Sequence, residues 1–342
     1  MNYTAPWWLP GGNLQTIWAA RMAVRFVGAA PTFRRERWAT PDHDFIDVDF
    51  LDTANPTLDR DCDCDTSPPL SVSVQPLLVV FHGLEGSSQS HYCQALAAAA
   101  TKRGWACCIP HFRGCSGELN NGPRAYHSGD FEELDWILRR LQAQHSGPLL
   151  AVGISLGGNA LMRWAGELGS SAALVVRAVA SVSSPLDLAA GGWAIGRGFN
   201  RHVYTRMFLR SMVPKALQKL DQHPGLFSRS DMLAVRDIYA FDNIFTAPLH
   251  GFKNTDDYYQ RASAKPHLQS VAVPALALNA VNDPFIPAWS LPTPAQAGHC
   301  VTLWQPRHGG HVGFPESEPP FGYPAHVRAM PDAVTAFLGA HL

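Results

Sequence analysis

Gly153-Ile154-Ser155-Leu156-Gly157 is the stretch that decides the fold of this chain. It stands between an apolar run, residues 149–152, and a helix-prone stretch, residues 159–168. A G-x-S-x-G pattern in this position is typical of the nucleophile elbow, a sharp strand-to-helix turn that lifts a serine hydroxyl clear of a sheet. Glycine suits both ends of the pattern because the backbone is strained there and neighbouring strands crowd it. The alternative is a glycine-rich loop that merely turns the chain, and the pattern alone does not separate the two.

Short apolar runs alternate with helix-prone segments from residue 77 onward. The expected strands are residues 77–81, 105–109, 149–154, 174–182, 275–279 and 300–304. Such alternation predicts an α/β fold, with a mostly parallel sheet and helices on both of its faces. Before these units, Ile46, Val48 and Phe50 alternate with two aspartates, which predicts a strand with one solvent-exposed face. We expect that strand to pair with residues 34–38 as an antiparallel edge of the sheet.

The pattern also predicts how the chain is divided. Residues 1–31 form an aromatic, proline-rich arm that needs a surface to lie on, so we expect it to pack on the core. Residues 32–185 and 269–342 form the predicted core, and residues 186–268 interrupt the alternation as a predicted helical cap. Residues 53–76 are rich in Asp, Pro, Ser and Thr, which favours a long, exposed and poorly ordered loop.

The composition limits the classes of partner. Apolar residues make up 46% of the 342 residues and charged residues only 16%, which indicates a compact globular protein. The formal net charge is −1, and the chain shows no strong excess of basic residues of the kind that duplex nucleic acids require. We therefore expect a small-molecule substrate and no nucleic acid partner.

Cysteines and the N-terminus indicate the compartment. The seven cysteines form neither an even disulfide framework nor a paired C-x-x-C set, which favours a reducing environment. Cys62 and Cys64 lie among aspartates, but without a second pair of ligands a solvated acidic loop is favoured over a metal site. Residues 1–12 lack the features of a signal peptide, and no apolar run approaches about 18 residues. We expect a cytoplasmic protein with no integral membrane segment, no metal and no cofactor.

A serine nucleophile needs a base within hydrogen-bond reach, and the base needs an acid that orients it. Asp283 lies directly beyond the strand expected at residues 275–279, although an aspartate before proline is also a common turn starter. The next strand ends in a glycine-rich loop that carries His308 and His311, and either histidine is a candidate base. The glycines that flank His311 favour it, because a histidine that swings over a serine needs an unobstructed loop. The order serine, acid, histidine, each after a predicted strand, favours Ser155, Asp283 and His311 as a catalytic triad.

The negative oxygen of a tetrahedral intermediate needs two fixed N–H donors. One normally comes from the residue after the nucleophile, which is Leu156, and the other from the loop after an earlier strand. Here that loop is His82-Gly83-Leu84, and we expect the Leu84 amide to be the second donor. Gly83 allows the backbone to approach the substrate oxygen, and we expect His82 to hydrogen-bond within the loop.

Five separated motifs resemble one family. They are Trp8-Leu9-Pro10-Gly11-Gly12-Asn13-Leu14-Gln15-Thr16, His82-Gly83-Leu84-Glu85-Gly86, Phe112-Arg113-Gly114-Cys115-Ser116-Gly117, Ala247-Pro248-Leu249-His250-Gly251-Phe252 and Gly309-Gly310-His311-Val312-Gly313-Phe314. In this order, and across almost the whole chain, they resemble the YheT-like hydrolases of the α/β-hydrolase superfamily. The resemblance implies an α/β-hydrolase fold and a carboxylic-ester hydrolase for short or medium acyl esters, with eukaryotic relatives that act on phospholipids. It also supports His311 over His308. We expect the long loop of residues 53–76 to be a departure from the family, and no membrane anchor of the eukaryotic kind.

Two other functions compete with a serine esterase. Metal-dependent hydrolysis draws on the 15 histidines, but no H-x-x-x-H spacing of a strong metal site occurs. A catalytically silent scaffold that binds a ligand or a protein is the alternative from another class. Within the predicted cap, arginines would attract an anionic substrate or simply form a solvated face, and the Phe, Met and Trp residues would line an acyl pocket or pack the cap.

Overall fold

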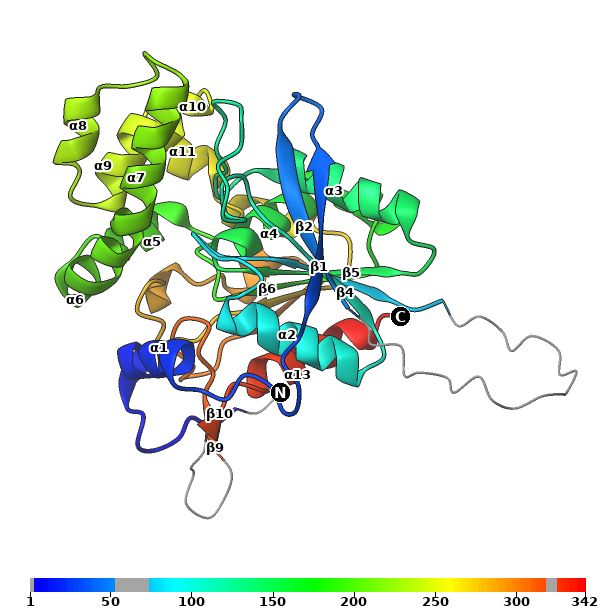
Figure 1. Cartoon of the computed structure of the whole chain (residues 1–342). Helices are drawn as coiled ribbons and strands as arrows, with labels where there is room; N and C mark the ends of the chain where they lie inside the picture. Colours follow the sequence, from blue (N-terminus) through cyan, green and yellow to red (C-terminus); the bar gives the residue numbers. More distant parts are fainter. Residues whose placement is uncertain (1–2, 53–73, 318–324) are drawn as a thin grey trace, which may run out of the picture.

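A mostly parallel sheet forms the centre of the molecule in the computed structural model, which describes residues 3–52, 74–317 and 325–342 (Figure 1). Among these residues its strand order is β1-β2-β4-β3-β5-β6-β7-β8. The strands are β1 (Phe33–Ala39), β2 (Phe45–Leu51), β3 (Leu77–Phe81), β4 (Ala106–Pro110), β5 (Leu149–Ile154), β6 (Ala178–Val182), β7 (Ala275–Leu278) and β8 (Val301–Trp304). Strands β3 to β8 are parallel, and β2 is antiparallel to both of its neighbours, so the predicted α/β fold is confirmed. Strand β6 begins at Ala178 and not at the predicted residue 174, which is the last residue of a 3₁₀ helix, Gly169–Leu174.

Helices cover both faces of this sheet. On one face lie α2 (His91–Lys102) and α13 (Ala329–Gly339), and on the other lie α3 (Phe131–Gln144) and α4 (Leu156–Leu168). Each strand supplies side chains to both layers in alternation: in β3, Leu78 packs with α2 and α13. Its neighbours in the strand pack with α3 and α4. Burial on both faces explains why these strands are continuous apolar runs in the sequence.

The prediction that one face of β2 is exposed to solvent was wrong. Asp47 and Asp49 are only 2% and 4% exposed. Strand β2 lies between β1 and β4, and Arg37 and Arg35 of β1 stand directly opposite the two aspartates in the register. Both arginines form paired hydrogen bonds of 2.7 to 3.0 Å with the carboxylates. Cross-strand ion pairs therefore satisfy charges that the alternation pattern assigned to solvent.

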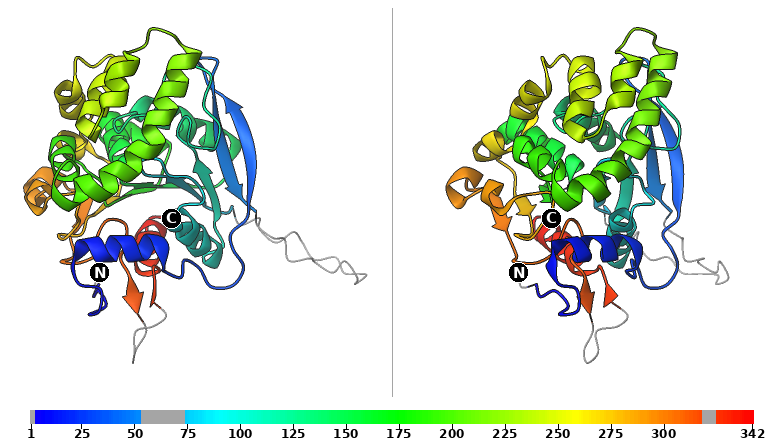
Figure 2. Two further views of the ribbon diagram at one scale, coloured as in Figure 1. Left: turned by 60° about the vertical axis from the view of Figure 1, so that its left-hand side comes forward. Right: turned by 90° about the vertical axis from the view of Figure 1, so that its left-hand side faces the viewer.

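Helices replace strands between β6 and β7. They are α5 (Leu188–Ile195), α6 (Gly198–Asn200), the π-helical turn Arg201–Thr205, α7 (Arg206–Gln222), α8 (Arg229–Ala234), α9 (Ile238–Phe241), the π-helical turn Asp242–Thr246, α10 (Ala247–Leu249), α11 (Thr255–Ala262) and the 3₁₀ helix Lys265–Ser270. They gather on one side of the sheet (Figure 2). The division of the chain into a core and a cap of residues 186–268 stays a prediction.

The remaining elements lie near the two termini. Helix α1 (Gly11–Arg21) belongs to the aromatic arm, and α12 (Pro294–Ala297) precedes β8. Strands β9 (Glu316–Ser317) and β10 (Ala325–His326) form a small antiparallel pair before α13.

Some expectations fall on residues that the structure leaves out. Residues 53–73 of the predicted loop, with Cys62 and Cys64, lie outside the described residues. Within the described part of the chain, no helix is both long enough and apolar enough to cross a membrane. The cytoplasmic location stays a prediction.

Candidate active site

Ser155 lies at the turn where β5 ends and α4 begins. Its φ of 52° and ψ of −117° are unusual for a residue with a side chain, as expected for a strained elbow. The flanking glycines leave no room for a side chain: a Cβ at Gly153 would lie 2.4 Å from the Gly157 carbonyl oxygen. A Cβ at Gly157 would lie 2.5 Å from the carbonyl oxygen of His82. Close backbone packing therefore accounts for both glycines of the pattern. A loop that only turned the chain would not need glycine at both positions.

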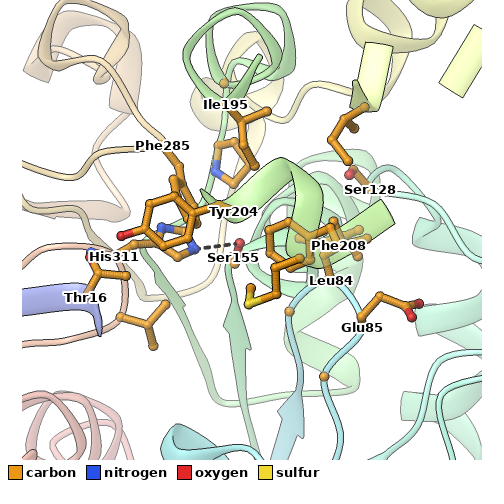
Figure 3. Close-up of a pocket in the computed structure, with 18 of the residues that line it drawn as sticks. Thr16, Leu84, Glu85, Ser128, Ser155, Ile195, Tyr204, Phe208, Phe285 and His311 are labelled. Atoms are coloured by element: carbon orange, nitrogen blue, oxygen red, sulfur yellow. Dashed lines mark hydrogen bonds between the residues drawn. The ribbon is translucent and has the colours of Figure 1, made fainter. Parts of the chain in front are cut away.

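His311 lies between Ser155 and Asp283. Figure 3 shows its hydrogen bond to Ser155 as a dashed line. Its Nε2 is 3.0 Å from the Ser155 Oγ, and its Nδ1 is 2.9 Å from Oδ2 of Asp283. The carboxylate accepts from Nδ1–H, so Nε2 carries the lone pair and accepts the hydrogen bond of the Ser155 hydroxyl. The three side chains predicted from the sequence are thus brought together in a continuous hydrogen-bonded row.

The position of Asp283 is set by its own loop. Its side chain is completely buried, and its Oδ1 also accepts a hydrogen bond of 2.8 Å from the Phe285 amide. The Phe285 ring packs on the His311 imidazole with centroids 4.3 Å apart. One segment therefore holds the carboxylate and supports the imidazole that it orients.

His308 does not face the serine. Its side chain is exposed, and its Nδ1 lies 3.5 Å from the side-chain amide of Asn282. The structure therefore pairs His311, and not His308, with Ser155.

The N-terminal arm braces the histidine loop, a role that the sequence analysis missed. Thr16 of α1 accepts a hydrogen bond of 2.8 Å from the His311 amide. Gln15, also on α1, accepts from the Gly309 amide at 2.8 Å and from the side chain of Asn282 at 3.0 Å. Both α1 residues are buried, which is unusual for polar side chains on a short helix. The pair Gln-Thr inside an otherwise apolar stretch was the available signal, but the partner loop lies almost 300 residues away.

The amides of the two predicted oxyanion donors have no hydrogen-bond acceptor among the described residues. Neither the Leu84 nor the Leu156 amide donates a hydrogen bond to any of the described residues, whereas Gly83 donates to the Tyr92 hydroxyl. A Cβ at Gly83 would lie 3.2 Å from the Ser155 Cβ, so this loop runs close to the nucleophile. Unpaired amides beside the serine are what an oxyanion site requires.

The loop that carries Leu84 is held from several sides. His82 Nδ1 lies 2.8 Å from the Gly83 carbonyl, and its Nε2 accepts from the Phe112 amide at 3.1 Å. Complete burial lowers the pKa of His82 to about 3, so this imidazole is neutral and structural, as predicted. On the other side, the Glu85 amide donates to the Tyr126 hydroxyl at 3.0 Å.

A cavity of about 550 Å³ opens over Ser155 and His311. Helices from residues 188–246 supply much of its apolar lining, including Ile195, Tyr204 and Phe208 (Figure 3). A second cavity of about 120 Å³ shares Leu84 and Leu156 with the first. An apolar space of this size that ends at a nucleophile suits an acyl chain.

Asp242 is one of the residues that line both cavities. Asp242 is almost fully buried and accepts hydrogen bonds from Thr246 at 2.6 Å and from Tyr259 at 2.9 Å. Burial raises the pKa of Asp242 to about 6, because the charged form loses its hydration. A partly protonated carboxyl near neutral pH was not predicted from the sequence.

The described part of the chain contains no cluster of residues that could bind a metal ion. Among residues 3–52, 74–317 and 325–342, no group of three or more His, Cys, Asp or Glu side chains is placed to hold a metal ion. The described His and carboxylate groups thus supply no donor set for the metal-dependent alternative.

Comparison with known proteins gives consistent matches over most of the chain. Residues 76–318 match the family model described as alpha/beta hydrolase fold. The chain is 39% identical over 305 residues to a protein of Escherichia coli (strain K12) named "Putative esterase YheT", covering 88% of this chain and 84% of that protein. It is 29% identical over 302 residues to human "Phospholipase ABHD3", covering 85% and 69% of the two chains.

Solved structures share the same fold at low identity. The esterase Pf2001 of Pyrococcus furiosus superposes with a TM-score of 0.53 at 14% identity, over 93% of this chain and 99% of that one. A structure described as a membrane phospholipase A gives a TM-score of 0.52 at 13% identity, over 90% and 86% of the two chains. These similarities concern the arrangement of strands and helices.

Proposed function

This chain belongs to the α/β-hydrolase superfamily and, within it, to the YheT-like hydrolases, and from this premise we propose that it is a serine esterase. It would cleave carboxylic esters of short or medium acyl chains, lipid-like esters among them, through an acyl-enzyme. The observation that carries the proposal is the hydrogen-bonded row Ser155–His311–Asp283 at the end of an apolar cavity.

In the proposed reaction, His311 Nε2 takes the proton of the Ser155 hydroxyl as Oγ attacks the ester carbonyl carbon. The carbonyl oxygen becomes negative, and the Leu84 and Leu156 amides donate to it. His311 then returns the proton to the alkoxide leaving group as the carbon–oxygen bond of the ester breaks. A water molecule, deprotonated by the same imidazole, releases the acid and restores Ser155. Asp283 holds the tautomer of His311 and stabilises the imidazolium at each stage.

The cavity supports the proposed substrate class. Its walls are mainly apolar, and residues such as Ile195 and Phe208 come from the segment 186–268, which we propose to be a cap over the acyl chain. The names of the relatives, an esterase and a phospholipase, agree with an ester substrate that carries an acyl chain. No cofactor takes part in the proposed reaction.

Substitution of Ser155 tests the proposal. On p-nitrophenyl esters of increasing acyl length, Ser155→Ala is expected to lower kcat on the order of 10⁴-fold or more. A fluorophosphonate probe should label the wild type at Ser155 and leave the variant unlabelled. Ser211→Ala is the matched control, since Ser211 lines the same cavity but its hydroxyl binds the Phe208 carbonyl.

Two outcomes would contradict this assignment. A folded Ser155→Ala protein that keeps its esterase activity would remove Ser155 from the reaction. A folded wild type that neither hydrolyses any of the esters nor reacts with the probe would favour the silent scaffold.

A further inference from the structure

Apolar side chains at the mouth of the cavity continue onto the surface of the molecule. Ile17 of α1 and Met207 of α7 both line the cavity, yet they are 37% and 46% exposed. One helical turn before each of these positions, the exposed Leu14 and Val203 extend the same apolar surface outward. We call the exposed side chains of residues 14–21 and 199–210 the cavity rim. Helices α1 and α6 lie on the same side of the molecule, which faces the viewer in the right-hand view of Figure 2.

Basic residues are interleaved with these apolar ones. Residues 188–220 contain four arginines and two lysines and no aspartate or glutamate, although the whole chain has 27 basic and 28 acidic residues. On the rim itself, Arg21, Arg201, Arg206 and Arg210 are exposed. None of these four forms an ion pair with a residue of the described part of the chain. The rim is therefore apolar and positively charged in a protein that is close to neutral overall.

From this combination we infer that the cavity rim docks on the surface of an anionic lipid layer. Exposed apolar side chains enter the boundary between head groups and acyl chains, and arginines beside them bind anionic head groups. Because Ile17 and Met207 belong to both the rim and the cavity, the apolar path from a docked layer to Ser155 is continuous. The docking goes beyond the proposed function, and only the entry of an ester along this path depends on it.

Other occupants fit the rim less well. A second copy in a twofold contact would bring two unpaired basic rims face to face, which like charges oppose. A protein bound across the rim would close the mouth through which a substrate enters. An anionic lipid layer provides head groups that pair with the arginines, and it supplies acyl chains at the same place.

Vesicle sedimentation tests the inference without relying on catalysis. The wild type is expected to sediment with vesicles of phosphatidylcholine and phosphatidylglycerol, and less with phosphatidylcholine alone or at high salt. Arg201→Glu and Phe199→Ser should each weaken binding on the order of tenfold, since one reverses a rim charge and the other removes a half-exposed ring. Arg177→Glu is the matched control, because Arg177 is exposed just before β6, at the opposite end of the strands from Ser155.

An activity assay with a short, water-soluble ester distinguishes a failure of the docking surface from a failure of the proposed function. All these variants should hydrolyse it at the wild-type rate, because none of the substituted residues lines the cavity. Two results would overturn the docking surface. One is a wild type that does not sediment with anionic vesicles, and the other is an Arg201→Glu variant that binds them as strongly as the control Arg177→Glu does. A dimer without lipid that Arg201→Glu strengthens would also overturn it, in favour of contact between copies. If no ester is hydrolysed but the sedimentation pattern holds, the proposed function fails and the docking surface stands.

Discussion

The hydroxyl of Thr16 accepts a hydrogen bond of 2.8 Å from the backbone amide of His311, 295 residues later in the chain. The same hydroxyl donates to the Gly12 carbonyl at 2.7 Å, so α1 holds it in place. Together with Gln15, this residue fixes the loop from which the imidazole reaches Ser155. The N-terminal arm thus belongs to the framework of the candidate active site.

Removing this brace should reduce turnover more than stability. Thr16→Val keeps the shape but leaves the His311 amide without its acceptor, so we expect kcat to fall about 10-fold to 100-fold through loss of alignment. Steady-state kinetics on a p-nitrophenyl ester, with thermal unfolding measured alongside, check this. Thr101→Val is the control, since the Thr101 hydroxyl binds only a carbonyl of its own helix, α2. Equal kcat values for the two variants would show that the brace does not position His311.

Replacing the acid should preserve the fold and impair the chemistry. In Asp283→Asn, the amide cannot stabilise the imidazolium and favours the wrong tautomer of His311, so kcat should drop on the order of 10³–10⁴-fold. The rate of labelling by a fluorophosphonate should fall in parallel, because that reaction also needs an activated Ser155. A kcat within tenfold of wild type in a folded variant would count against Asp283 as the acid.

The elbow should tolerate no side chain at its second glycine. Gly157→Ala would place a Cβ 2.5 Å from the His82 carbonyl oxygen and 2.6 Å from that of Phe81, both rigid backbone atoms. We expect the free energy of unfolding to fall by about 2–4 kcal/mol, as for other overpacked sites. Gly339→Ala on α13 is the control, because its new methyl group would meet mainly the Trp105 side chain, at 3.1 Å. Denaturant unfolding of both variants measures the difference, and equal values would contradict the backbone clash.

The buried carboxyl of Asp242 should make stability depend on pH. Burial raises its pKa from 3.8 to about 6, so the folded protein holds this proton more tightly than the unfolded chain does. The carboxyl therefore costs no stability below about pH 4, and the cost grows to about 3 kcal/mol as the pH rises through 6. Asp242→Asn removes this cost, and the hydroxyls of Thr246 and Tyr259 can rotate to bind the amide.

The expected result is a variant that is more stable than wild type above pH 7 and loses this advantage near pH 4. Unfolding free energies measured across this range check the prediction. The exposed Asp231, changed to Asn, should leave the pH profile as it is. A constant difference between Asp242→Asn and wild type at every pH would mean that Asp242 does not titrate in this window.

Filling the cavity should change the preferred acyl length. Ile195 lies on α5, within the predicted cap, and its side chain lines the cavity (Figure 3). Ile195→Trp is expected to lower kcat/KM on longer p-nitrophenyl esters on the order of tenfold and to spare the acetate ester. Ile137→Val, in the core beneath the sheet, is the control for a general loss of packing. A uniform loss across all acyl lengths would place the acyl chain elsewhere.

Local pattern predicted the α/β fold and the position of the elbow well. Strand β5, the glycines around Ser155 and helix α4 are neighbours in the chain, so propensity, periodicity and sterics act on one short segment. The prediction of an exposed face on β2 failed because it depended on residues of another strand. Asp47 and Asp49 look solvated in the alternation, but Arg37 and Arg35 on another strand bury them as ion pairs.

The sequence by itself determined a strand–serine–helix turn, an acid and two candidate histidines in a fixed order. Each of these is recognised from its own strand and the loop that follows it, which are neighbours in the chain. Only the tertiary structure brought His311 rather than His308 to Ser155, buried Gln15 and Thr16 against the histidine loop, and placed α1 beside Tyr204 and the other cavity-lining residues of 203–208. Those relationships join segments that are 150 to 300 residues apart. No local periodicity encodes such pairs, since they depend on how the sheet and its helices pack in space.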